Sequence, residues 1–86
     1  MSAILPINPN SKHLRILIID EYEVVRHALA LRLNQLPSLV VVGDTGNYEQ
    51  GTAETLKLKP DVVLLELKGV HHQIFDPVRK LLRSAD

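Results

Sequence analysis

The chain has 86 residues, 45% of them hydrophobic and 23% charged, and its ten basic and ten acidic residues leave no formal net charge. This balance excludes the basic excess that a nucleic-acid footprint needs, and the longest apolar run is too short to span a bilayer. Cysteine is absent, which excludes disulfides and thiolate metal sites and fits a reducing cytoplasm. A chain of this length forms one small domain, which buries about 60–65% of its unfolded surface.

The first twelve residues differ in composition from the rest of the chain. They contain two prolines, two asparagines and two serines, and Pro6 and Pro9 interrupt any regular element. We therefore expect residues 1–12 to form a flexible N-terminal arm, with Ile4, Leu5 and Ile7 as its possible anchors. Residues 13–86 are expected to form the single domain.

A strand is predicted over residues 13–20, because Ile16-Leu17-Ile18-Ile19 is aliphatic and rich in β-branched residues. Asp20 and Glu21 follow it and open a helix, at the end where the helix dipole favours anions. This helix is predicted over residues 22–36, and Pro37 stops it. Its expected apolar side consists of Val25, Ala28, Leu29, Leu33 and Leu36.

A short second strand is predicted over residues 39–42, followed by a turn over residues 43–47 that is rich in Gly, Asp and Asn. A second helix follows over residues 48–58. Several residues in it have low helix propensity, so packing of Ala53 and Leu56 on the sheet must stabilise it.

The third strand is predicted over residues 61–68, where four large apolar residues, Val62 to Leu65, end abruptly at Glu66. Such a run is typical of a strand that is buried on both faces. A loop is expected over residues 69–75. Asp76 and Pro77 then predict the start of a third helix, as its cap and its first residue.

Strands that alternate with helices predict an α/β fold with a parallel sheet and right-handed crossovers. We expect a flavodoxin-like sheet with flanking helices, reduced to three strand–helix units, with the strands in the spatial order 2-1-3. Ligands then bind at the carboxyl ends of the strands. The carboxylates of Asp20, Glu21 and Glu66 all fall at this edge.

Three carboxylates at one edge repel one another, so they must raise their pKa values or hold a hard cation. Magnesium fits, because it takes oxygen ligands and often retains several waters. The simpler alternative is that Glu66 is a solvated side chain at a strand end. His71 and His72 in the following loop are interpreted as solvated residues, because adjacent loop residues rarely face the same ion.

The sequence resembles the receiver domains of response regulators, especially those that precede a helix-turn-helix output domain in bacterial transcription factors. The similarity covers about residues 13 to 68. The matching stretches are Ile16-Leu17-Ile18-Ile19-Asp20-Glu21, Glu23-Val24-Val25-Arg26-His27-Ala28-Leu29, Leu39 to Gly43, and Lys59-Pro60-Asp61-Val62-Val63-Leu64-Leu65.

The resemblance implies roles for four residues. In that family, the acidic pair after the first strand binds magnesium, and this pair corresponds to Asp20 and Glu21. An aspartate at the end of the third strand accepts a phosphoryl group, and Glu66 occupies that position. The residue two further on offers a backbone carbonyl to the metal, which corresponds to Lys68.

The sequence departs from the family pattern in three ways. Glu66 replaces the acceptor aspartate, and its extra methylene moves the carboxylate about 1.5 Å outward. The usual Met-Pro-x-x-x-Gly stretch is replaced by residues 69–75. Only three of the five strand–helix units are present, so the hydroxyl residue and the lysine that read the phosphoryl group are missing.

These features favour a degenerate receiver, or pseudo-receiver, which is not an enzyme and acts in two-component signalling through protein partners such as a sensor histidine kinase or an output domain. Two alternatives remain open. One is a metal-dependent phosphohydrolase with Asp20 as its nucleophile. The other is a structural homodimer that pairs through the exposed edge of the third strand. Direct nucleic-acid binding is not expected.

Overall fold

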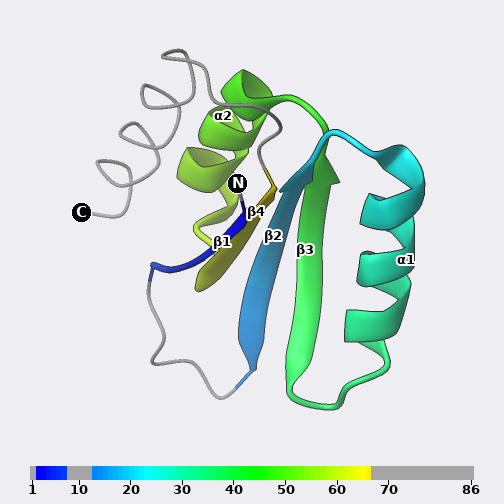
Figure 1. Cartoon of the computed structure of the whole chain (residues 1–86). Helices are drawn as coiled ribbons and strands as arrows, with labels where there is room; N and C mark the ends of the chain where they lie inside the picture. The colour runs from blue at the N-terminus through cyan, green and yellow to red at the C-terminus, as the bar shows by residue number, and fades with distance from the viewer. Residues whose placement is uncertain (1, 8–12, 67–86) are drawn as a thin grey trace.

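The computed structural model describes residues 2–7 and 13–66, which form a four-stranded sheet with a helix on each face (Figure 1). Lys68, the predicted loop with His71 and His72, and the predicted helix from Asp76 lie outside the described residues. In chain order, the elements are β1 (Ser2–Pro6), β2 (Leu14–Asp20), α1 (Glu23–Asn34), β3 (Leu39–Thr45), α2 (Tyr48–Leu58) and β4 (Val62–Glu66).

The three parallel strands have the predicted arrangement. The sheet order is β1-β4-β2-β3, so the second, first and third predicted strands are adjacent, in the order 2-1-3. β2 pairs in parallel with both β3 and β4. The fold class predicted from the sequence is therefore confirmed, and the carboxyl ends of β2 and β4 lie next to each other.

The N-terminal residues differ from the prediction, because Ser2–Pro6 form β1 rather than part of a flexible arm. β1 pairs antiparallel with β4, from Ser2 opposite Glu66 to Pro6 opposite Val62. Pro6 is tolerated there because β1 is an edge strand with one neighbour. The edge of β4 that we expected to be exposed is therefore covered by the chain's own N-terminus, and the predicted homodimer through that edge loses its basis.

The buried core is centred on β2. Ile16, Leu17, Ile18 and Ile19 are all at most 4% exposed, as expected for a central strand. β4 differs from the prediction, because it is fully buried on only one face. Val63 and Leu65 belong to the core, whereas Val62, Leu64 and Glu66 on the other face are half-buried. This less covered face is the one on which α1 lies.

β3 is three residues longer than predicted. Gly43, Asp44 and Thr45, which have the composition of a turn, continue the strand because they pair with the carboxyl half of β2. The register shifts between Ile16 and Leu17, so that Val42 is accommodated as an extra residue. Pairing with a long central strand has overridden local turn propensity here.

α2 has the predicted bounds, but its contact with the sheet differs from the prediction. Its buried residues are Gly51 and Thr55, whereas Ala53 is exposed and Leu56 is 57% exposed. The Thr55 hydroxyl donates to the Gly51 carbonyl at 2.8 Å, so the hydroxyl is satisfied within the helix. Small residues thus let α2 approach the sheet closely.

α1 is shorter than predicted and is rotated about its axis. It ends at Asn34 because Leu36 precedes Pro37, and a residue before proline avoids the helical region. None of its residues is fully buried. Arg26, Ala30 and Leu33 are half-buried. The other residues of the predicted apolar side are exposed, although Leu29 still lines a pocket over the sheet. None of the helices within residues 13–66 is long and apolar enough to cross a membrane.

Candidate functional site

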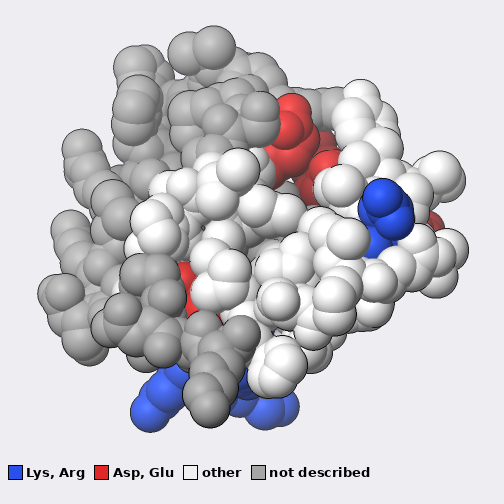
Figure 2. Space-filling model, turned by 90° about the horizontal axis from the view of Figure 1, so that it is seen from below, with Lys and Arg blue, Asp and Glu red and all other residues white. Residues whose placement is uncertain are grey.

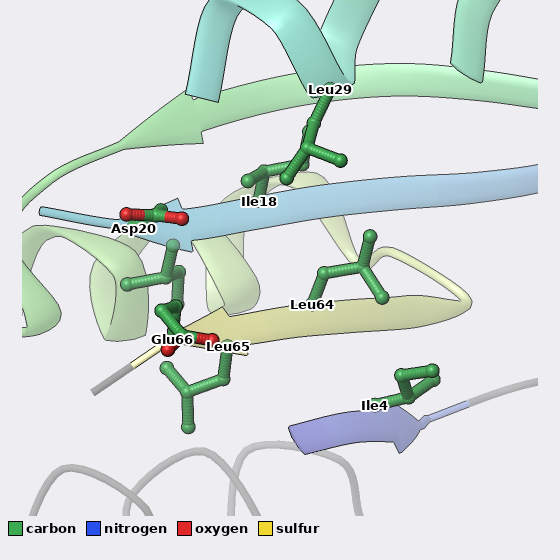
Figure 3. Close-up of a pocket in the computed structure, with 8 residues that line it drawn as sticks. Ile4, Ile18, Asp20, Leu29, Leu64, Leu65 and Glu66 are labelled. Carbon is green, nitrogen blue, oxygen red and sulfur yellow. The ribbon is translucent and has the colours of Figure 1, made fainter. Parts of the chain in front are cut away.

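The carboxyl ends of β2 and β4 bring two of the predicted site residues together. Asp20 and Glu66 are register partners on neighbouring parallel strands, so their side chains lie on the same face of the sheet. Both side chains line a pocket of about 420 Å³ beside α1 (Figure 3). The other lining residues are Ile4, Ile18, Ile19, Leu29, Leu64 and Leu65. The pocket thus has an apolar floor and an acidic end.

The Asp20 carboxylate is held in place by the chain that follows it. The residue is only 3% exposed, and its Oδ1 accepts a hydrogen bond from the Tyr22 backbone N–H at 2.8 Å. Among the hydrogen bonds of the described residues, none is given to the other carboxylate oxygen, Oδ2. The Asx-type turn fixes the direction of the side chain before α1 begins.

Glu21 carries the second carboxylate of the predicted acidic pair, and it contacts the start of α2. Its side chain is exposed, and its Oε1 lies 3.1 Å from the Tyr48 hydroxyl. The same hydroxyl lies 2.5 Å from the Glu66 backbone carbonyl, to which it donates. Tyr48 thereby ties the start of α2 to the ends of β2 and β4. Tyr48 was not predicted as a residue of this site. The only signal for it in the sequence was its position in the first turn of the second predicted helix, which begins at the carboxyl ends of the strands.

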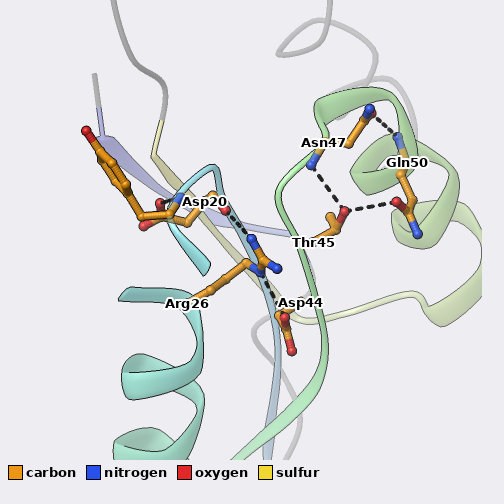
Figure 4. Close-up of polar contacts among 7 residues, drawn as sticks. Asp20, Arg26, Asp44, Thr45, Asn47 and Gln50 are labelled. Atoms are coloured by element: carbon orange, nitrogen blue, oxygen red, sulfur yellow. Dashed lines mark hydrogen bonds and ion pairs between the residues drawn. The ribbon is translucent and has the colours of Figure 1, made fainter. Parts of the chain in front are cut away.

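Arg26 is a second residue whose role was not predicted, because the expected apolar side of the first helix did not include it. Its Nη1 donates to the Asp20 backbone carbonyl and its Nε donates to Asp44 Oδ1, both at 2.9 Å (Figure 4). The Arg26 and Asp44 side chains are 15% and 30% exposed. Gly46 leaves room for the guanidinium, because a Cβ there would lie 2.7 Å from Nη1. Arg26 therefore joins α1, the end of β2 and the end of β3.

Replacing Arg26 with Ala should lower the free energy of unfolding by about 1–3 kcal/mol, because two partly buried, charge-assisted hydrogen bonds are lost. Arg26→Lys should recover only part of this loss, since one ammonium cannot reproduce the two directions of the guanidinium. Urea denaturation measures both effects. The matched control is Arg32→Ala in the last turn of the same helix, where the side chain makes only an exposed bond to Gln35. Equal losses for Arg26→Ala and Arg32→Ala would contradict the bridging role.

The site can be tested for its fit to magnesium from its donor atoms. Asp20 and Glu66 offer carboxylate oxygens on one face of the sheet, which suits a hard cation. Within residues 2–7 and 13–66, no three His, Asp or Glu side chains are grouped closely enough to hold a metal ion by themselves. Any ion at this edge would therefore be completed by waters or backbone carbonyls, as magnesium sites commonly are.

Together, the order of the parallel strands and the paired carboxylates at their ends define a flavodoxin-like domain of the receiver class. No protein-family model matches the chain. The curated relatives agree with the class. The chain is 35% identical to the response regulator GacA of Pseudomonas viridiflava over 71 residues, which are 83% of this chain and 33% of that protein.

Two further relatives have different names. A protein-glutamate methylesterase/protein-glutamine glutaminase 2 of Cereibacter sphaeroides is 48% identical over 71 residues, which are 83% of this chain and 20% of that protein. The transcriptional regulatory protein LiaR of Bacillus subtilis is 37% identical over 54 residues, which are 63% of this chain and 26% of that protein. The chain therefore spans a third or less of these relatives, and its similarity to them supports a receiver domain.

Proposed function

We propose that this chain is a degenerate receiver module of two-component signalling that acts through protein–protein contacts in transcriptional regulation, in the cytoplasm and without enzymatic activity of its own. One observation carries the proposal. Glu66 ends β4 on the same sheet face as Asp20. By the sequence resemblance, it stands where the family has its phosphoacceptor aspartate. A carboxylate is kept there, but it is carried on a longer side chain.

The extra methylene of Glu66 places its carboxylate about 1.5 Å further from the backbone than an aspartate would. Phosphoryl transfer requires close and well-aligned approach of the attacking oxygen, and misplacement on this scale costs orders of magnitude in rate. The longer carboxylate also puts negative charge further out from the strand end, which partly imitates a phosphorylated aspartate. Glu66 therefore favours a fixed signalling state over a phosphorylation-dependent switch.

Magnesium is part of this proposal as a ligand of the acidic edge. Asp20, Glu21 and Glu66 would supply carboxylate oxygens and Lys68 its backbone carbonyl, with waters completing the shell. When bound, the ion would neutralise the charge gathered at the strand ends. Glu21 would have to leave its contact with the Tyr48 hydroxyl to take part.

The proposed partners are proteins of the same signalling system, either a sensor histidine kinase or an output domain. The names of the relatives support this proposal, because they include response regulators and a transcriptional regulatory protein. Nucleic-acid binding is not part of the proposal. On the face of the molecule shown in Figure 2, Lys and Arg side chains lie at separate margins and form no continuous basic patch within the described residues.

Incubation with a small-molecule phosphodonor and magnesium is expected to leave the intact mass of the chain unchanged. The Glu66→Asp variant restores the shorter side chain, so it is the matched test of whether side-chain length blocks transfer. Any adduct on this variant should disappear in the double variant Asp20→Asn/Glu66→Asp. Stoichiometric phosphorylation of Glu66 in the unmodified chain would overturn the degenerate-receiver proposal and indicate an active receiver.

A further inference from the structure

Tyr48 stands where the start of α2 meets the carboxyl ends of the strands. Its ring packs against the buried core cluster, whereas its hydroxyl lies at the edge of the sheet. The turn before it is held to the end of β3, because the Asn47 N–H donates to Thr45 Oγ1 at 3.2 Å and the Asn47 side chain accepts from the Gln50 N–H at 3.0 Å (Figure 4). The phenol oxygen is therefore held in place beside the acidic edge.

Two acceptors compete for the one proton of the Tyr48 hydroxyl. The hydroxyl lies 2.5 Å from the Glu66 backbone carbonyl, to which it donates, and 3.1 Å from Glu21 Oε1. A phenol O–H has a single proton to donate, so the shorter contact leaves the Glu21 carboxylate without a full share of it. The Glu21 side chain is also exposed, whereas the contact with Glu66 is partly buried. Glu21 is thus the less tightly held of the two acceptors.

The charges at this edge give the Glu21 carboxylate two alternative positions. The preceding residue, Asp20, has a buried carboxylate on the same sheet face as the Glu66 side chain. Without a cation, these two negative charges repel Glu21 and favour its contact with Tyr48. A divalent cation at the edge reverses this preference, because it attracts a carboxylate more strongly than a neutral hydroxyl does.

We propose that Tyr48 couples magnesium binding at the acidic edge to the start of α2. In the exchange, the Glu21 carboxylate moves from the Tyr48 hydroxyl to the ion, and the hydroxyl keeps its hydrogen bond to the Glu66 carbonyl. Tyr48 is a positioning residue, because it contacts two residues of the edge and does not itself bind the ion. The inference rests on the magnesium site proposed above, and it adds a second position for Glu21 and a residue that responds to the ion.

Tyrosine fluorescence measures this exchange. The chain has two tyrosines and no tryptophan, so the emission of the Tyr22→Phe variant comes from Tyr48 alone. A carboxylate beside a phenol hydroxyl quenches the emission, because it accepts the proton of the excited state. Addition of magnesium to Tyr22→Phe should therefore raise the emission, while calorimetry on the same variant measures magnesium binding independently.

Two further variants test whether Glu21 is the carboxylate that moves. Adding Glu21→Ala to Tyr22→Phe should abolish the rise in emission at saturating magnesium. The matched control adds Glu23→Ala instead, at an exposed position in the first turn of α1, and should keep the full rise. Circular dichroism checks that each variant folds.

The affinity for magnesium gives a second readout, which a purely structural role of Tyr48 would not produce. Tyr48→Phe keeps the ring but removes the competing hydroxyl, so it should bind magnesium about fivefold more tightly, the equivalent of one neutral hydrogen bond. A chain that shows no calorimetric magnesium binding would remove both the magnesium site and this inference. Binding without a change in emission, an equal rise in the Glu21→Ala background, or an unchanged or weaker affinity of Tyr48→Phe would overturn the coupling and leave the magnesium site standing.

Discussion

A chain that begins at residue 8, and so lacks β1, is expected to be strongly destabilised and to self-associate. The deletion removes all five register pairs between β1 and β4 and leaves the edge of β4 unpaired. It also removes Leu5 and Ile7, which pack against the core, and the bond from the Ile7 N–H to the Asp61 carbonyl at 2.6 Å. The combined loss is about 3–5 kcal/mol, which is a large part of the stability of a small domain.

Self-association follows from the same deletion, because an unpaired apolar strand is a template for pairing with another chain. Thermal denaturation and sedimentation velocity of the shortened chain measure the two effects. Two point variants separate packing from strand pairing. Leu5→Ser should destabilise the full chain, whereas Ile4→Ser, at a position that is 71% exposed, should have little effect on stability. A shortened chain that stays monomeric with an unchanged melting temperature would contradict the role assigned to β1.

The position of β1 explains why the expected open edge is absent. In the flavodoxin-like order 2-1-3-4-5, the fourth strand lies beside the third. Here β4 is the third of the parallel strands in chain order. The place beside it is taken by β1, which runs antiparallel and comes from the N-terminus. Its pairing with β4 was not predictable from residues 1–12, whose prolines and asparagines favour irregular structure. An edge strand needs only one neighbour and tolerates Pro6, so tertiary pairing decided its structure.

Strand order and the meeting of Asp20 with Glu66 were predictable, because β2 and β4 are strongly apolar runs that each end in a carboxylate. The side-chain contacts were less predictable. Apolar periodicity predicted Val25 on the sheet side of the helix, but Val25 is 43% exposed, and Arg26 turns inward because it finds Asp44 and the Asp20 carbonyl there. Arg26 and Asp44 are 18 positions apart in the sequence, so no local sequence pattern predicts that they pair.

The same limit applies to Tyr48. Its hydroxyl donates to the Glu66 carbonyl, and the two residues are 18 positions apart, so no local sequence pattern predicts this contact. Sequence patterns gave the bounds of α2 but not the rotation of the helix about its axis. The low helix propensity of Gly51 looked like a weakness, although this residue is what allows the helix to approach the sheet. A glycine in a helix is thus better interpreted from what lies opposite it than from propensity alone.

Gly51→Ala should destabilise the fold by about 1–3 kcal/mol, although alanine is the better helix former by about 1 kcal/mol. A Cβ at Gly51 would clash with Ile19 Cδ1 and would lie 2.8 Å from Ile19 Cγ1. Ile19 is fully buried and packed in the core cluster, so a shift of its side chain disturbs its core neighbours. α2 must therefore shift away from the sheet, and Thr55 loses part of its burial with it.

Urea denaturation of three variants distinguishes this clash from helix propensity. Ala53→Gly, at an exposed position of α2, measures propensity alone and should cost about 1 kcal/mol. Ile19→Val removes the Cδ1 atom that the new Cβ would meet first. The double variant Ile19→Val/Gly51→Ala should therefore be more stable than the sum of the two single effects predicts. Strict additivity would show that Ile19 does not limit the approach of α2, and that the loss at Gly51 has another cause.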